Sequence, residues 1–213
     1  MMEPYKYERT PHFSWSESVA SDDKIITSLA ILEACDDIVV TEKMDGENTN
    51  LYTNYLHARS ATYSYHPSRN WVKRLHAEMG FNIPENLKLC GENLYAKHSI
   101  HYQDLESYFL LFSVWTEEKV ALSWDETEEW AQLLGLKTVP VLYRGPWNEK
   151  LLRELPSKMD LNKQEGYVVR PARAIAQAEF GQCVAKYVRP QHVQSDEHWM
   201  HQEMVLNKLR QPI

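Results

Sequence analysis

The stretch TEKMDGENTN, residues 41–50, places a lysine just before a tight turn and surrounds it with carboxylates and amides. Two valines precede it and strand-like residues follow it, so the pattern predicts strands over residues 38–44 and 49–61 with the turn between them. Side chains alternate along a strand, so Val39, Thr41 and Lys43 are expected to share one face. The stretch is therefore either a charged hairpin or a strand that presents Lys43 as a chemical group.

The composition is that of one ordinary globular domain with a real core: 213 residues, 43% hydrophobic and 25% charged. The net charge of −7 argues against a broadly basic nucleic-acid binder. Residues 144–189, however, hold nine Lys and Arg against five Asp and Glu, a net of +4, which leaves −11 for the rest. A local basic surface is therefore compatible with the sequence.

Three widely spaced cysteines fit neither a disulfide framework nor a zinc knuckle, and they favour a reduced, cytoplasmic protein. The N-terminus lacks the apolar region of a secretory signal, and no apolar run is long enough to span a membrane, so no membrane partner is expected.

The remaining periodicity predicts an α+β fold with largely antiparallel sheets, because strands outnumber helices and the connections are irregular. Further strands are expected near 87–90, at 108–115, and in the runs 166–171 and 183–190. Helices are expected over 22–35, over 68–79 with Gly80 as the stop, from the Ser123–Glu126 capping box to Gly135, and over 147–155. Residues 1–190 are expected to form one domain, and 191–213 a tail with an amphipathic helix over 196–210.

Glycines are scarce, at seven in the chain, and three of them stand beside an acid at a predicted strand end. These pairs are Asp45-Gly46, Gly91-Glu92 and Glu165-Gly166. Each pair alone is an ordinary turn, because Asp-Gly and Gly-Glu are common in loops. An acid at the mouth of a sheet can also meet a sugar hydroxyl or a metal ion. Three such pairs, interleaved with Lys43 and Lys186 on strands, favour the second interpretation.

Read in order, these residues resemble the motifs of the covalent nucleotidyltransferases, the superfamily of DNA ligases, RNA ligases and mRNA capping enzymes. The K-x-D-G motif is matched by residues 43–46, and the later motifs by Arg59, Gly91-Glu92, residues 108–115, residues 165–169 and residues 186–189. Together they span residues 42–189. The branch that the sequence is most similar to is the ATP-dependent RNA ligases of the RNA ligase 2 type.

The resemblance implies an adenylyltransferase fold with the nucleotide bound between the sheets. It implies that Lys43 attacks the α-phosphorus of ATP to form lysyl-AMP, and that Lys186 stabilises the charge that develops. AMP would then pass to an RNA 5′-phosphate, and a 3′-hydroxyl would attack that phosphate and displace AMP to seal the strand, as in RNA repair. A neutral Lys43 is required, so its pKa is expected to be lowered by Lys186 and by Mg²⁺ or Mn²⁺ on ATP.

The same resemblance assigns the supporting residues. The expected nucleotide contacts are Glu42 to the adenine edge, Asn48 and Glu92 to the ribose, Arg59 to phosphate, Gly46 through its backbone, and Phe109 stacked on adenine with Tyr108 as its rival. Glu165 is expected to hold the metal ion, with Asp45 sharing that task or orienting the ribose.

Two departures from the family pattern leave alternatives open. Val188 stands where motif V usually has a second lysine, and Arg189 would point to the opposite face of a regular strand. Ser113 follows Phe112 where an aspartate is usual. No OB-fold module is expected in the chain, so a separate RNA-binding or end-healing partner would bind the polynucleotide substrate in its place. The alternatives are a DNA nick ligase, a GTP-using capping-type enzyme, and a non-catalytic module that binds a nucleotide or an RNA end. The loop KHSIH, residues 97–101, is either a plain loop or a contact for single-stranded RNA.

Overall fold

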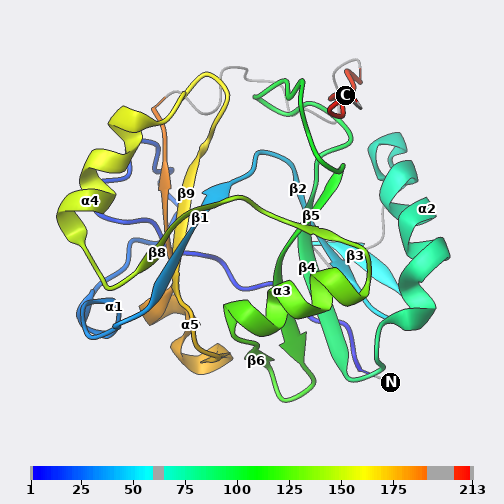
Figure 1. Cartoon of the computed structure of the whole chain (residues 1–213), viewed down its shortest axis with the longest axis horizontal. Helices are drawn as coiled ribbons and strands as arrows, with labels where there is room; N and C mark the ends of the chain where they lie inside the picture. The colour runs from blue at the N-terminus through cyan, green and yellow to red at the C-terminus, as the bar shows by residue number, and fades with distance from the viewer. Residues whose placement is uncertain (1, 60–64, 191–203, 212–213) are drawn as a thin grey trace.

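Two sheets lie side by side in the computed structural model, which describes residues 2–59, 65–190 and 204–211 (Figure 1). The four-stranded sheet has the order β11-β9-β1-β8, and all its neighbours are antiparallel. Its strands are β1 (Ile38–Lys43), β8 (Val141–Gly145), β9 (Gly166–Pro171) and β11 (Ala185–Val188). The predicted strand over 38–44 and the run 166–171 are therefore confirmed.

The seven-stranded sheet has the order β10-β6-β5-β4-β2-β3, and β7 pairs with β5 in the parallel sense. Its strands are β2 (Glu47–Leu51), β3 (Leu56–Ala58), β4 (Leu87–Asn93), β5 (Phe109–Thr116), β6 (Val120–Ala121), β7 (Lys137–Thr138) and β10 (Ile175–Ala176). The other pairs are antiparallel, so the predicted α+β fold with largely antiparallel sheets is confirmed.

Short helices surround the two sheets, some on their outer sides and some near the junction between them (Figure 1). They are α1 (Ala30–Glu33), α2 (Asn70–Met79), α3 (Trp124–Leu133), α4 (Glu149–Glu154) and α5 (Gln177–Cys183), with 3₁₀ turns η1 (Pro67–Arg69), η2 (Gly80–Asn82) and η3 (Leu155–Lys158). The capping box that begins α3 is confirmed, because Ser123 and Glu126 satisfy each other's backbone N–H groups. None of the described helices is long and apolar enough to cross a membrane.

Several predicted elements are wrong, and in each case tertiary contacts replace the local preference. The helix over 22–35 is reduced to α1, because Ile25 forms a bridge with His12 and Ile26 is buried against the four-stranded sheet. The strand over 49–61 is a hairpin, β2–β3, closed by the Tyr52 N–H that donates to the Tyr55 carbonyl (2.8 Å).

Two further elements differ at the C-terminal end. The strand predicted over 183–190 begins only at Ala185, because Cys183 ends α5. The tail helix predicted over 196–210 falls partly on residues outside the described ones. Its described part is extended, because Leu206 and Leu209 form bridges with Ala96 and Leu105.

The two sheets pack against each other through clusters that draw residues from both. Val39 of β1 packs with Leu110 of β5, and Trp115 of β5 packs with Val184, which precedes β11. The other face of β1, with Ile38 and Val40, faces a separate core under α1 and α4. Lys43, two residues beyond Thr41 on the face of Val39, is therefore carried into the space between the sheets.

Candidate active site

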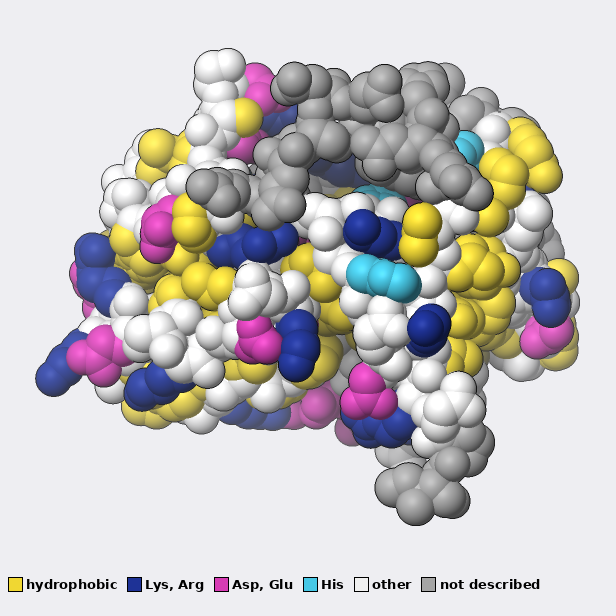
Figure 2. Space-filling model, turned by 90° about the horizontal axis from the view of Figure 1, so that it is seen from above, with side chains coloured by type: hydrophobic (Ala, Val, Ile, Leu, Met, Phe, Trp, Pro, Cys, Tyr) yellow, Lys and Arg dark blue, Asp and Glu magenta, His cyan; other side chains and the backbone are white. Residues whose placement is uncertain are grey.

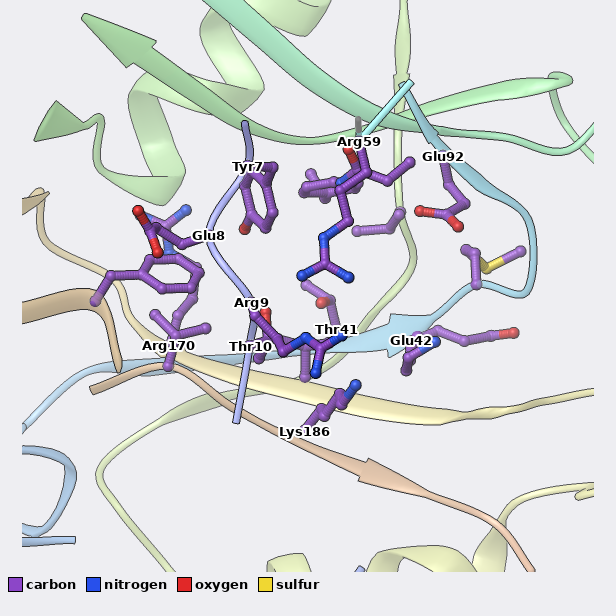
Figure 3. A pocket seen from close by; sticks show the side chains of 18 of the residues that line it. Tyr7, Glu8, Arg9, Thr10, Thr41, Glu42, Arg59, Glu92, Arg170 and Lys186 are labelled. Atoms are coloured by element: carbon purple, nitrogen blue, oxygen red, sulfur yellow. The ribbon is translucent and has the colours of Figure 1, made fainter. Parts of the chain in front are cut away.

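A pocket lies between the two sheets (Figure 3). Segments of both sheets converge on it. Of the residues expected at a nucleotide site, those that line the pocket are Glu42, Lys43, Asn48, Arg59, Glu92 and Lys186. The structure thus brings together residues that stand up to 144 positions apart in the sequence, as the motif order predicted.

Lys43 forms an ion pair with Glu165, which is 1% exposed. Burial by itself lowers the pKa of Lys43, but the carboxylates of Glu165, Glu92 and Asp45 outweigh it and hold that pKa above its ordinary value. The expectation of a lowered pKa is therefore wrong for the protein alone. In this state Lys43 is an ammonium group without a lone pair, so any nucleophilic role requires the carboxylate charge around it to be compensated.

Glu92 lies on β4 beside the turn between β1 and β2. The Gly46 N–H donates to Glu92 Oε1 (3.2 Å). Burial raises the pKa of Glu92 to about 8, because the lowering effect of Lys43 is offset by Glu165 and Asp45. Gly46 itself is not in the pocket wall; a Cβ there would lie 2.5 Å from the Asn93 carbonyl oxygen, so glycine is required where the turn packs on β4.

Glu42 projects from β1 next to Lys43. Its Oε2 accepts a hydrogen bond from Gln164 Nε2 (2.8 Å), one residue before Glu165. This bond fixes the carboxylate and leaves Oε1 with acceptor capacity toward the pocket. Asn48, on β2, uses its Oδ1 to accept from Asn50 Nδ2 (3.1 Å), so the Asn48 amide group keeps its two N–H donors for the pocket.

Lys186 and Arg59 supply positive charge to the pocket. Burial lowers the pKa of Lys186 to about 8, and the nearby charges of Lys43 and Arg59 act in the same direction. The backbone of Lys186 is held by the N-terminal segment, since its N–H donates to the Pro11 carbonyl (2.9 Å) and its carbonyl accepts from the Phe13 N–H (2.8 Å).

Arg189 does not line the pocket, in agreement with its expected position on the other face. It is 8% exposed, and its backbone N–H donates to the Glu165 carbonyl (2.9 Å). This hydrogen bond joins the end of β11 to the residue that pairs with Lys43.

One carboxylate oxygen of Asp45, for which a metal or ribose role was expected, is committed to hydrogen bonds within the protein. Asp45 is 5% exposed, and its Oδ2 accepts from the Ser99 N–H (2.8 Å), the Ser99 hydroxyl (2.8 Å) and the Ile100 N–H (2.6 Å). Its own N–H donates to the Tyr102 hydroxyl (3.0 Å). The carboxylate therefore holds the 97–101 loop against the turn, which explains why that loop lies near the site.

The described residues contain no group of three or more His, Cys, Asp or Glu arranged to hold a metal ion. Glu165 and Glu92 nevertheless lie close enough to shift the pKa of the same lysine. Two carboxylates that leave most ligand positions open suit Mg²⁺ or Mn²⁺, which bind through few protein oxygens when phosphates and water supply the rest. The donor set thus fits a metal ion carried by a nucleotide.

Phe109 is wholly buried and packs outside the pocket, so its expected stacking on adenine is wrong. Phe109 and Leu111 face the outer core, whereas Leu110 and Phe112 face the other sheet. Phe112 of β5 and Val168 of β9 both line the pocket. A bulge in β5 at this point leaves Phe112 without a partner on β4. Its rival Tyr108 packs edge-on against Trp71 and does not line the pocket.

The sequence reasoning missed the N-terminal segment entirely. Residues 7–10 run across the pocket and contribute four lining side chains (Figure 3). The other lining residues that it missed are Thr41, Met44, Phe112, Trp124, Val139, Val168, Arg170, Phe180 and Val184. A pattern of aromatic and basic residues in KYERT, 6–10, was the available signal, but nothing local fixes which strands it would cross.

These features define a nucleotidyltransferase fold: two antiparallel sheets, a lysine on an inner strand, and acids and cations from distant segments around it. A family model for RNA ligase matches residues 36–188, which is more than half of the chain. The chain belongs to the RNA ligase family. Among curated proteins, no similar sequence was found.

Solved structures share the fold at low sequence identity. An archaeal ATP-dependent RNA ligase matches with a TM-score of 0.61 at 16% identity, over 88% of this chain and 48% of its own. A protein from Aquifex aeolicus, provisionally described as an ATP-dependent DNA ligase, matches with a TM-score of 0.59 at 20% identity, over 90% and 51%. An RNA ligase from Naegleria gruberi, determined with pyrophosphate, gives 0.53 and 20%, over 87% and 61%. The chain thus spans about half to three fifths of the length of these proteins.

Proposed function

We propose that this chain acts as an ATP-dependent RNA ligase through a lysyl-AMP intermediate on Lys43. The observation that carries the proposal is the position of Lys43 at the inner end of β1, on the wall of the pocket between the sheets and in contact with the buried Glu165. A lysine with only a structural role does not require a pocket beside it, whereas a nucleophile requires space there for its substrate.

In the proposed first step, Lys43 Nζ attacks the α-phosphorus of ATP, and the bond to the β-phosphate oxygen breaks. Nζ loses its proton, a P–N bond forms, and pyrophosphate leaves. Lys186 lies on β11 of the same sheet as Lys43, with its charge directed into the pocket, where it would stabilise the negative charge on the α-phosphate (Figure 3). Its strand pairs with β9 on one edge and with the N-terminal segment on the other, which keeps that charge in place.

The ion pair with Glu165 must loosen before Lys43 can react, because the protonated amine is not a nucleophile. Glu165 and Glu92 would hold a divalent ion that accompanies ATP, and this ion would supply positive charge that compensates theirs and lowers the pKa of Lys43. The chain's own contribution is to place Glu165 in a buried site where its charge is strongly felt.

The base would lie toward the apolar end of the pocket. Phe112 offers an aromatic face there, and Glu42, fixed by Gln164, is placed to accept a hydrogen bond from the exocyclic amine of adenine. Guanine carries a carbonyl at the corresponding edge, which a carboxylate disfavours. This arrangement favours ATP over the GTP of the capping-type alternative.

In the later steps, an oxygen of a polynucleotide 5′-phosphate attacks the lysyl-AMP phosphorus, the P–N bond breaks, and Lys43 regains a proton. A 3′-hydroxyl then displaces AMP from the activated end. RNA is proposed as the substrate because the family that the chain belongs to is that of RNA ligases. DNA remains the second candidate, since a protein described as a DNA ligase shares the fold to a similar extent.

Incubation with ATP labelled at the α-phosphate and Mg²⁺ or Mn²⁺ tests the proposal. Wild type should take up acid-labile label, and Lys43→Ala and Lys43→Arg should take up none, since arginine stays protonated. Lys150→Ala is the matched control, because that lysine is 86% exposed on α4, away from the pocket. Labelled GTP run in parallel tests the capping alternative, and sealing of nicked RNA against nicked DNA tests the substrate. A wild type without label would leave a non-catalytic binding module as the better interpretation, and a labelled Lys43→Ala would exclude Lys43 as the nucleophile.

A further inference from the structure

The N-terminal segment bridges the two sheets across the pocket. On the seven-stranded sheet, the Tyr5 N–H donates to the Tyr52 hydroxyl (3.2 Å), and Lys88 Nζ lies 3.3 Å from the centroid of the Tyr5 ring. On the four-stranded sheet, Pro11 and Phe13 pair with the backbone of Lys186. Residues 6–10 therefore span the gap with both ends anchored. This segment precedes residue 36, where the match to the family model begins.

Arg9 sits in the middle of this span. Figure 3 shows its guanidinium group extending into the same part of the pocket as the tips of Arg59 and Lys186. The three cations come from three segments: the N-terminal bridge, the end of β3 and strand β11. Figure 2, which looks at the molecule from above Figure 1, shows further Lys and Arg side chains in dark blue along the middle of that face.

Like charges that converge in one pocket repel one another unless an anion joins them. The lowered pKa of Lys186, to which burial contributes most and Lys43 and Arg59 add, is one sign of that repulsion. The NH1 group of Arg9 donates to the Asp22 backbone carbonyl (2.6 Å) and to the Asp22 carboxylate (3.0 Å), but this contact is at the surface, with the Asp22 side chain 72% exposed. An exposed pair of this kind contributes little and exchanges readily for a phosphate.

We propose that Arg9 is a phosphate-binding residue of this pocket, supplied by a segment outside the part of the chain that matches the family. The ligand is a phosphate anion, and the two sources are the β- and γ-phosphates of ATP and the 5′-phosphate of a polynucleotide. The proposal rests on the proposed function for the identity of these sources. It assigns the N-terminal bridge a role in binding as well as in joining the sheets.

Binding of inorganic tripolyphosphate, measured by calorimetry without a metal ion, tests the site independently of any reaction. Arg9→Ala should weaken binding about tenfold or more, as expected for a charge-assisted hydrogen bond, and Arg9→Lys should recover part of the loss. Lys6→Ala, an exposed cation three residues away that does not line the pocket, should change binding less than about twofold. Asp22→Ala removes the carboxylate and leaves the backbone carbonyl of residue 22 as a partner of Arg9, so it should leave binding unchanged or tighter.

Two kinetic arms distinguish the sources. A higher KM for ATP in lysyl-AMP formation places Arg9 at the β- and γ-phosphates. Slower transfer of AMP from isolated adenylylated protein to a 5′-phosphorylated oligonucleotide places it at the 5′-phosphate. Arg9→Gln, with its thermal midpoint checked against wild type, replaces Arg9→Ala if that variant does not fold.

Either kinetic defect supports the proposal. Equal values for Arg9→Ala and wild type in all three measurements overturn the proposal. A loss of tripolyphosphate affinity in Asp22→Ala as large as that in Arg9→Ala also overturns it, because it would indicate that the ion pair matters only to the fold. If wild type forms no lysyl-AMP while tripolyphosphate binding depends on Arg9, the proposed function fails and the phosphate site stands.

Discussion

Lys43 and Glu165 form an ion pair that joins β1 to the start of β9, and the carboxylate of this pair is almost completely buried. The two strands run antiparallel with Lys43 opposite Gly166, so the backbone register itself sets Glu165 beside Lys43. The ion pair therefore follows from strand pairing, and it keeps the Lys43 amine protonated.

Replacing Glu165 by glutamine should lower the pKa of Lys43, since burial remains and the largest charge that opposes it is removed. The pH midpoint for modification of Lys43 by an amine reagent, followed by mass spectrometry, should move down by roughly one unit or more. Glu42→Gln is the control, because Glu42 is not among the groups that shift Lys43. An unchanged midpoint in Glu165→Gln would show that the ion pair does not govern the lysine.

Glu92 should make the protein less stable as the pH rises from about 4.5 to about 8. Its pKa is raised in the folded state to about 8, so the folded protein binds more protons than the unfolded chain in this window, and the free energy of unfolding falls with pH. Glu92→Gln removes this dependence. The variant should be more stable than wild type at pH 8, by at most about 5 kcal/mol at 1.36 kcal/mol per pKa unit.

Urea denaturation of Glu92→Gln and wild type between pH 4.5 and pH 8 measures the difference, which should shrink toward the acid end. The pKa of Lys186 is lowered to about 8, so this group raises the free energy of unfolding with pH only above about pH 8. It therefore does not account for a change between pH 4.5 and pH 8. A constant difference across the window would contradict the shift of Glu92.

Substitutions of Phe109 and Phe112 should have sharply different effects, although both residues lie on β5. Phe109→Ala leaves a cavity in the outer core and should lower the free energy of unfolding by about 3–5 kcal/mol, with ATP affinity of the folded protein unchanged. Phe112→Ala should weaken ATP binding about tenfold, as expected for loss of a stacked aromatic. Chemical denaturation and calorimetry with ATP separate the two effects. The reverse pattern would restore Phe109 as the stacking residue.

Asn207 should stabilise the loop that holds Asp45. It is 1% exposed; its Nδ2 donates to the carbonyls of Leu94 (2.8 Å) and Ala96 (3.2 Å), and its Oδ1 accepts from the Tyr102 N–H (2.9 Å). Asn207→Ala leaves these buried groups without partners and should cost about 2–3 kcal/mol.

Hydrogen exchange at residues 94–102 should become faster in Asn207→Ala, because the loop loses its anchor. Arg210→Ala is the matched control, since Arg210 pairs with the exposed Asp104 and Glu106 and should contribute less than about 1 kcal/mol. Unchanged exchange in this loop would show that the 204–210 segment rests on it without restraining it.

Local patterns in the sequence predicted the elements whose signals are self-contained. The alternation around Val39, Thr41 and Lys43 predicted β1 and its inner face, and the Ser123–Glu126 capping box predicted the start of α3. The helix expected over 22–35 failed because apolar residues at helical spacing can equally be buried by a neighbouring segment. Here His12 and the four-stranded sheet supply that burial.

The sequence by itself determined which residues are candidates for the chemistry, because K-x-D-G, the two later Gly–acid pairs and Lys186 are short motifs whose residue types limit what they can do. Only the tertiary structure decided how they are used. Strand pairing sets Glu165 on Lys43, loop contacts commit Oδ2 of Asp45 to Ser99 and Ile100, and strand alternation turns Phe109 into the core and Phe112 into the pocket. No local pattern fixes the position of the bridge that carries Arg9, because that position depends on anchors in two sheets that are distant in sequence and adjacent only in the folded chain.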